Sequence, residues 1–372
     1  MVRRGIPVEV ISMEIENPLS ADFQRQAIPL LCLDERRVIY EDRIRKVLQR
    51  LAAFHPTAVV STLGAVSFET LRYLPPGVFR VGMGQSDDPQ VYEMMRRYGP
   101  WMDLVAMVSQ AMQQKAQAMP DFARVPVGYL PYGVPMCPAT ELPMRPLTQP
   151  LRILYLGRLD REQKRVHLFP EILRHLVAGG APFRWTIVGE GPERAFLEAN
   201  LKTDSPSQTV TFAGAIHYAD VSRILRDHDV FLLASDYEGL PLSLLEAMGY
   251  GLVPVVTDLA SGIREVVDAA SGFRIPVDDV AGYARAILHL HQHRDEFAAK
   301  SAAARARVAQ DFSVAAMTDR WLAAIPATAA GGEAWSNHWR ITAPLEVSGA
   351  FHFSPPMRLV RRLAKRLQTF CK

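Results

Sequence analysis

The sequence predicts an α/β protein with two doubly wound domains. Its 372 residues suffice for two domains of ordinary size, and 49% hydrophobic with 22% charged residues is the balance of a globular chain. Between about residues 151 and 311, short and almost wholly apolar segments alternate with helical patterns. Such segments are typical of strands buried on both faces, which indicates a parallel sheet between two layers of helices.

The second half of the chain carries the clearest pattern. Apolar runs predict strands at 151–156, 184–188, 209–212, 230–233 and 252–257. Helices are expected at 166–178, after residue 192, at 221–226, at 242–249 and near 263–267. The pair Gly179-Gly180 ends the first of these helices, as glycine commonly does.

The first half shows the same alternation less cleanly. Strands are expected at 8–12, 58–61, 78–81 and 104–108, with a helix at 40–54. Six prolines between residues 131 and 150 indicate a linker. We therefore expect an N-terminal domain at 1–142, a C-terminal domain at 150–325 and a tail at 326–372.

Composition excludes several classes of protein. The net charge of +3 is too small to indicate a nucleic-acid partner. Three widely separated cysteines favour a reducing compartment over a disulfide framework or a thiolate metal site. No apolar run reaches transmembrane length and the first residues lack a signal-peptide core, so a cytoplasmic protein is expected. His289, His291 and His293 point to different faces of a helical run, so no metal site is expected.

Two carboxylates eight positions apart, Glu238 and Glu246, flank a predicted helix start. Pro241 suits a first helical position, which leaves Glu238 in the preceding loop and Glu246 roughly 7 Å along the helix. The free N–H groups of Leu242 and Ser243 at the helix start favour an anion. The alternative is an exposed loop glutamate followed by a glutamate on a helix surface.

Two cations follow the strand at 151–156. Arg158 and Lys164 would lie at the carboxyl end of that strand, where open α/β sheets bind ligands, and would neutralise a departing diphosphate. The alternative is two solvated side chains in a charged loop. A second turn, at Gly189, has the G-x-G spacing but Arg194 in place of the third glycine, so a dehydrogenase is disfavoured. That turn is either a contact near a nucleotide base or simply a tight turn.

Together, the order and spacing of these segments resemble the family 4 glycosyltransferases of the GT-B fold. The resemblance covers about 170 residues and depends on Leu156-Gly157-Arg158-Leu159, Lys164, Ile187-Val188-Gly189-Glu190-Gly191-Pro192, Phe212-Ala213-Gly214 and Glu238-Gly239-Leu240-Pro241-Leu242-Ser243-Leu244-Leu245-Glu246. It implies two Rossmann-like domains facing across a cleft. The C-terminal domain would bind a nucleotide-diphospho-sugar and the N-terminal domain the acceptor, with retention of anomeric configuration and no required metal.

The resemblance also implies roles for individual residues. Arg158 and Lys164 would hold the donor diphosphate and stabilise the leaving group. Glu238 would contact the donor sugar and Glu246 the ribose. The backbone of Leu242 and Ser243 would meet phosphate, and Gly189 would lie near the bound nucleotide.

The chain departs from the family pattern in two places. Many members begin with a strand, a glycine-rich loop and a helix, whereas this sequence begins at what looks like the second strand. We expect an N-terminal domain without its first strand and a true start upstream of Met1. Gln85 stands where the family usually has a histidine, and a neutral glutamine can donate a hydrogen bond but cannot take a proton.

The expected function is transfer of a sugar to a saccharide or lipid-linked acceptor in polysaccharide or cell-envelope glycan synthesis. The alternatives are a nucleotide-sugar-binding protein without turnover and another GT-B enzyme, such as a nucleotide-sugar epimerase or a phosphorylase. The tail predicts a basic amphipathic helix at 357–370 that either packs on the protein or lies on the inner face of an anionic membrane. Its cations are Arg358, Arg361, Arg362, Lys365 and Arg366.

Overall fold

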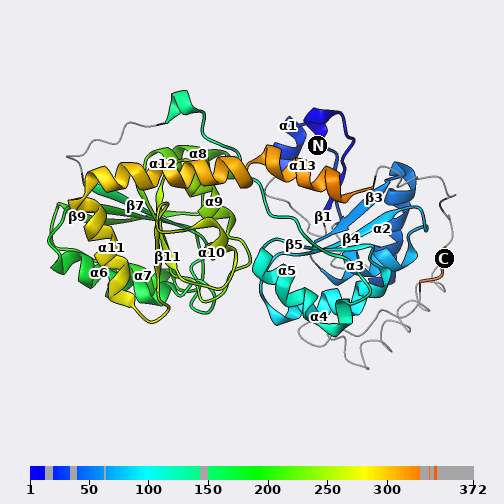
Figure 1. Cartoon of the computed structure of the whole chain (residues 1–372), viewed down its shortest axis with the longest axis horizontal. Helices are drawn as coiled ribbons and strands as arrows, with labels where there is room; N and C mark the ends of the chain where they lie inside the picture. Colours follow the sequence, from blue (N-terminus) through cyan, green and yellow to red (C-terminus); the bar gives the residue numbers. More distant parts are fainter. Residues whose placement is uncertain are drawn as a thin grey trace, which may run out of the picture.

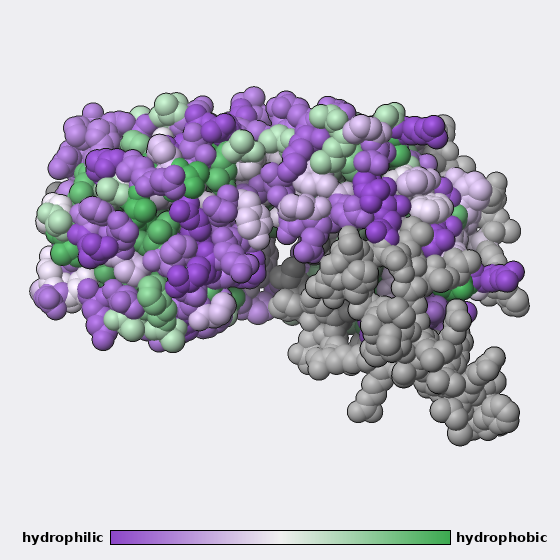
Figure 2. Space-filling view, turned by 90° about the horizontal axis from the view of Figure 1, so that it is seen from below, coloured by the Kyte–Doolittle hydropathy of each residue, from purple (hydrophilic) through white to green (hydrophobic). Residues whose placement is uncertain are grey.

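The computed structural model contains two α/β lobes joined side by side (Figure 1). It describes residues 1–12, 20–33, 40–62, 64–142, 150–326, 335 and 339–341. The predicted basic helix at 357–370 lies outside the described residues. Figure 2 shows that hydrophilic side chains, with scattered hydrophobic ones, cover the C-terminal lobe on the face seen from below. No helix in the described part of the chain is long and apolar enough to cross a membrane.

The C-terminal lobe is built on one six-stranded sheet in the order β12-β11-β10-β7-β8-β9, and every neighbouring pair is parallel. Its strands are β7 (Leu151–Leu156), β8 (Phe183–Val188), β9 (Gln208–Gly214), β10 (Val230–Leu233), β11 (Val253–Thr257) and β12 (Phe273–Ile275). The sequence pattern predicts five of them and misses β12, which has only three residues.

Helices cover both faces of this sheet. They are α6 (Phe169–Ala178), α7 (Arg194–Asn200), α8 (Tyr218–Arg226), α9 (Leu242–Gly249), α10 (Gly262–Val266), α11 (Val280–Gln292) and α12 (Arg294–Asp311). Helices α6 and α11 pack together on one face, and α9 packs against α12 on the other (Figure 1). Strands β10 and β11 are therefore fully buried and β7 is largely buried, which accounts for their mostly apolar sequences.

The order of the strands reverses at β7. The chain moves from β7 outward through β8 and β9, then returns to place β10 on the other side of β7. Main-chain pairing of Val230 with Ile153 and of Phe231 with Leu154 holds these two strands side by side. In open α/β sheets the crevice beyond the carboxyl ends of such strands is where ligands bind. The loops after β7 and β10 are thus brought to one place.

The strands of the N-terminal lobe fall into two sheets in the described part of the chain. One is parallel, in the order β3 (Ala58–Ser61), β4 (Phe79–Gly84), β5 (Leu104–Met107) and β6 (Val127–Tyr129). The other pairs β1 (Val10–Ser12) with β2 (Leu30–Cys32), also in parallel. The absence of a first strand, expected from the sequence, stays a prediction.

Helices of the N-terminal lobe surround these strands. They are α1 (Ser20–Arg25), α2 (Tyr40–Phe54), α3 (Ala65–Thr70), α4 (Pro89–Tyr98) and α5 (Gln110–Gln117). Short 3-10 turns lie at Val2–Arg4, Leu71–Tyr73, Gly99–Trp101, Pro120–Phe122 and Ala139–Glu141, with another at Val166–Leu168 in the C-terminal lobe. Helix α2 has the predicted bounds, because its buried side chains follow a helical period.

The last described helix, α13 (Val314–Ala324), returns to the N-terminal lobe (Figure 1). Ser313, just before it, forms a β-bridge with Val134 in the connection between the lobes. Arg4 also donates to Asp319 at 2.5 Å, which ties the helix to the start of the chain. The two lobes are therefore linked by the segment that follows β6 and by the passage from α12 into α13.

Candidate active site

The loops after β7 and β10 meet through an ion pair. Lys164, in the loop after β7, places its Nζ 2.5 Å from Oε1 of Glu238, in the loop after β10. Glu238 is 6% exposed, so this carboxylate is largely removed from water. A buried carboxylate needs a partner, and the neighbouring loop supplies it. Two residues 74 positions apart, predicted separately to serve one site, are thus in direct contact.

Arg158, in the same loop as Lys164, is exposed to solvent. Its side chain is 69% exposed, and Nη2 donates to Oε1 of Gln163 at 2.5 Å. The loop around it is ordered by Tyr155, whose hydroxyl donates to the Arg158 carbonyl oxygen at 2.5 Å. The guanidinium is therefore held beside the strand end while it remains open to a ligand from solvent.

The turn that carries Lys164 is organised by Asp160. Its Oδ1 accepts hydrogen bonds from the backbone N–H groups of Gln163 at 2.8 Å and Lys164 at 3.0 Å. Gln163 joins the turn to the β10 loop, since its carbonyl oxygen accepts from the Asp236 N–H at 2.8 Å and its Nε2 donates to the Tyr237 carbonyl at 3.3 Å. The two loops therefore form one connected unit.

Helix α9 starts directly after this loop. Pro241 is its N-cap residue, with extended backbone, rather than the first helical residue that the sequence suggests. The helix still begins at Leu242 as expected, and the first-turn N–H groups of Leu242 and Ser243 have no carbonyl within the helix to bind. Leu242 is exposed, so this helix end is open to an anion.

Glu246 is in the second turn of α9 and is half-buried. Burial raises the pKa of its carboxyl to about 7. Helical geometry places Glu246 about 6 Å along the helix axis from Leu242, slightly more than one turn into the helix. The helix thus bears an anion-binding end and, one turn later, a carboxyl group that gains a proton near neutral pH.

Gly189 brings a third strand end to the same edge. Its φ is +133°, and a Cβ atom there would lie 1.9 Å from the Gly157 carbonyl oxygen. Only glycine permits this approach between the turn after β8 and the end of β7. The geometry accounts for Gly189 as a tight turn at the site edge, and its contact with a nucleotide stays a prediction.

The N-terminal lobe reaches the Glu238 loop. A Cβ atom on Gly239 would lie 2.5 Å from the backbone oxygen of Gln85, which follows β4. Glu265 of α10 makes a second contact between the lobes. Its Oε1 accepts from the N–H groups of Gln110 at 2.5 Å and Ala111 at 3.2 Å, at the start of α5. Sequence reasoning placed Gln85 near the site but missed Glu265, for which the sequence offers no local signal.

Sequence reasoning also missed Ser235. Its Oγ donates to Oε1 of Glu238 at 2.7 Å, and the residue is fully buried. A serine just past the end of a strand, with an acidic residue three positions later in the loop, is a signal that would have suggested the contact. Ser235 and Lys164 bind the same oxygen of Glu238.

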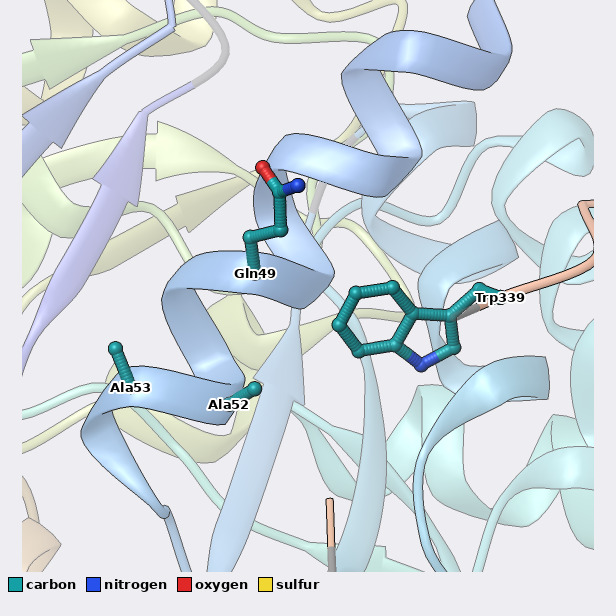
Figure 3. Close-up of a pocket in the computed structure, with 4 residues that line it drawn as sticks. All are labelled: Gln49, Ala52, Ala53 and Trp339. Atoms are coloured by element: carbon teal, nitrogen blue, oxygen red, sulfur yellow. The ribbon is translucent and has the colours of Figure 1, made fainter. Parts of the chain in front are cut away.

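Other features of the described residues lie outside this site. The rings of His289 and His293 stack at 4.2 Å, and no group of three or more metal-ligating side chains converges in the residues that the structure places. A surface pocket of about 320 Å³ lies on α2, lined by Gln49, Ala52, Ala53 and Trp339 (Figure 3). None of the pocket's side chains is ionisable.

Comparisons with known proteins agree with this description. Residues 150–293 match the family described as Glycosyl transferases group 1. The chain is 34% identical over 182 residues to the putative colanic acid biosynthesis glycosyltransferase WcaL of Escherichia coli, covering 47% of this chain and 43% of that protein. It is 36% identical over 174 residues to the amylovoran biosynthesis glycosyltransferase AmsK of Erwinia amylovora, covering 45% and 42%. The chain thus matches less than half the length of these relatives.

Solved structures share the two-lobed fold. Sucrose-phosphate synthase from Thermosynechococcus elongatus gives a TM-score of 0.68 at 17% identity, covering 87% of this chain and 91% of that one. A Staphylococcus aureus TarM mutant, in complex with Fondaparinux, alpha-GlcNAc-glycerol and UDP, gives 0.64 at 18% identity, covering 75% and 58%. The fold is therefore GT-B, with two Rossmann-like domains.

Proposed function

We propose that this chain is a retaining glycosyltransferase of family 4. It transfers a sugar from a nucleotide-diphospho-sugar to a saccharide or lipid-linked acceptor in polysaccharide or cell-envelope glycan synthesis. The observation that carries the proposal is the contact between Lys164 and Glu238 at the edge of the group 1 domain, beside the open N-terminus of α9. The named activities of WcaL and AmsK support the pathway.

The cations and the helix end would bind the diphosphate. Arg158 is exposed at the strand end, and Lys164, in the same loop, pairs with Glu238. The amides of Leu242 and Ser243 add the positive end of a helix. As the bond from the sugar to the diphosphate breaks, negative charge develops on the leaving phosphate oxygen. Fixed positive groups at that oxygen stabilise the transition state, so no metal is expected to be required.

Glu238 would hold the donor sugar. In the part of the chain that the structure places, both hydrogen bonds to its carboxylate use Oε1. Oε2 is thus left as an acceptor for sugar hydroxyl groups. Glu246, one turn into α9, would accept from the ribose hydroxyls in its ionised form. The acceptor would approach from the N-terminal lobe, where Gln85 adjoins the Glu238 loop.

A second candidate is a nucleotide-sugar-binding protein without turnover. The observation that favours it is Gln85, which borders the site and cannot take a proton. Retention without a protein base at that position needs another acceptor for the proton of the attacking hydroxyl, such as the leaving phosphate. Binding alone needs none. The two functions share the donor site and differ in whether product forms.

The proposal is tested by a thermal-shift screen with UDP-, GDP- and ADP-sugars, followed by product detection with a matched acceptor. One donor class should raise the melting temperature, and Glu238→Ala should abolish transfer while it keeps affinity for the nucleoside diphosphate. The control is Glu171→Ala, because Glu171 is half-exposed on α6 and pairs only weakly with Arg174. Binding without product in the wild type would favour the second candidate, and full activity in Glu238→Ala would contradict the site.

A further inference from the structure

We propose that Ser235 is a positioning residue that orients the Glu238 carboxylate toward the donor sugar. The inference rests on the function proposed above. Ser235 follows β10, is 0% exposed, and donates a hydrogen bond from Oγ to Oε1 of Glu238 at 2.7 Å. A hydroxyl that donates to a carboxylate makes a short charge-assisted bond, and burial excludes water as a substitute donor.

Two hydrogen-bond donors on one oxygen fix the rotation of the Glu238 carboxylate. Lys164 Nζ reaches Oε1 at 2.5 Å, from the loop opposite Ser235. With Oε1 held from both sides, Oε2 has a single direction in which to accept hydrogen bonds. An acceptor with one orientation can discriminate between sugar hydroxyl patterns, whereas a rotating carboxylate cannot.

The importance of Ser235 should increase when the donor binds. Lys164 is a flexible point charge, and a diphosphate dianion is a competitor for its ammonium group. As Lys164 turns toward phosphate, its bond to Glu238 weakens. Ser235 has no such alternative, because it is buried two residues past the end of β10. Ser235 is therefore the hydrogen-bond donor that keeps Oε1 of Glu238 in place while the sugar is bound.

The backbone around Glu238 does not depend on the Ser235 hydroxyl. The loop is tied to the turn at 160–164 by the bond from the Asp236 N–H to the Gln163 carbonyl, 2.8 Å, and by that from Gln163 Nε2 to the Tyr237 carbonyl, 3.3 Å. Removal of the hydroxyl should thus release the carboxylate and leave the loop folded. This separates a role in orientation from a role in folding.

The experiment compares Ser235→Ala and Ser235→Cys with a matched control, Ser271→Ala. Ser271 is also buried in this domain, 2% exposed, and donates to Oδ1 of Asp268 at 2.8 Å, also three residues away. It precedes β12, so it lies at the amino end of a strand of this parallel sheet, whereas the site lies at the carboxyl ends of β7 and β10. Both alanine variants remove a buried hydroxyl from a carboxylate, and only one of these carboxylates is proposed to face the donor.

The readout is affinity for a nucleoside diphosphate and for the matching nucleotide-sugar, measured by calorimetry, together with kcat and KM for transfer. Ser235→Ala should leave nucleoside diphosphate affinity within about twofold. It should reduce kcat/KM about tenfold to a hundredfold, the range that one hydrogen bond to a charged group supplies. Ser235→Cys keeps the size of the side chain with a weaker donor, so an intermediate loss is expected.

Three results would overturn the inference. One is wild-type transfer by Ser235→Ala, which would show that the hydroxyl has no effect on Glu238. Another is wild-type activity in Ser235→Cys combined with a loss in Ser235→Ala, which would indicate packing alone. The third is an equal loss in Ser271→Ala. A wild-type protein that neither binds nor turns over any nucleotide-sugar would instead contradict the proposed function, and with it the inference.

Discussion

Glu246→Gln should stabilise the unliganded protein above neutral pH while it weakens nucleotide binding. Burial raises the pKa of the Glu246 carboxyl from 4.5 to about 7, and no other cause contributes. The folded state therefore prefers the neutral acid. Glutamine has nearly the same shape and carries no charge, so it removes the cost of ionising a carboxyl at this position.

The sign of the pH dependence follows from linkage. Because the folded pKa lies above the unfolded one, the contribution to stability is complete below about pH 4.5 and is lost as pH rises through 7. At about 1.4 kcal/mol per pKa unit, the difference between 4.5 and about 7 corresponds to about 3 kcal/mol at pH 8 and above. Since Glu246 is only half-buried, about 1–3 kcal/mol is the expected range.

The assay is urea unfolding of wild type and Glu246→Gln at pH 4.5, 6, 7 and 8.5, with Glu171→Gln as the exposed control. The Glu246→Gln midpoint should equal that of the wild type at pH 4.5 and exceed it at pH 8.5, and the control should follow the wild type throughout. Nucleotide affinity at pH 8.5 should fall in Glu246→Gln, because an ionised acceptor binds hydroxyl groups more strongly. Identical pH dependence in the two proteins would refute this reasoning.

Three further substitutions have expected outcomes. Gly189→Ala should lower the melting temperature by several degrees, because its φ of +133° and the 1.9 Å approach to the Gly157 oxygen leave no room for a Cβ; an unchanged melting temperature would contradict this. Gly239→Ala should push the lobes apart at Gln85 and increase the radius of gyration in solution scattering, whereas an unchanged profile would argue against the contact. Glu265→Gln should weaken the contact between α10 and α5, because the Glu265 carboxyl accepts from two backbone N–H groups of α5, although burial raises its pKa. Increased protease sensitivity between the lobes is expected, and wild-type sensitivity would exclude this role.

Much of the C-terminal lobe was predictable from local pattern. Strand β7 and helix α9 have the expected bounds, because a largely buried strand is mostly apolar and because glycine and proline precede the helix. The N-terminal lobe was less predictable. Strand β2 has three half-buried residues, and α1 and α3 have six each, too few to show a period.

The candidate site was predictable in its parts and not in its contacts. The sequence places Lys164 and Glu238 after two strands, but only the strand order makes β7 and β10 neighbours and brings the two side chains together. The bond from Ser235 to Glu238 depends on the path of the loop. The contact of Glu265 with α5 depends on how the two lobes meet, which no local pattern encodes.

The proposed donor site is tested most directly by calorimetric titration of a nucleotide-sugar against wild type, Lys164→Ala and Glu238→Gln. Wild type should bind, and Lys164→Ala should lose at least about tenfold in affinity for both the nucleotide-sugar and the free nucleoside diphosphate. Glu238→Gln should lose affinity only for the nucleotide-sugar. This pattern would assign the cation to the diphosphate and the carboxylate to the sugar. Equal affinities in all three proteins, or no binding of any nucleotide-sugar by the wild type, would contradict the proposed donor site.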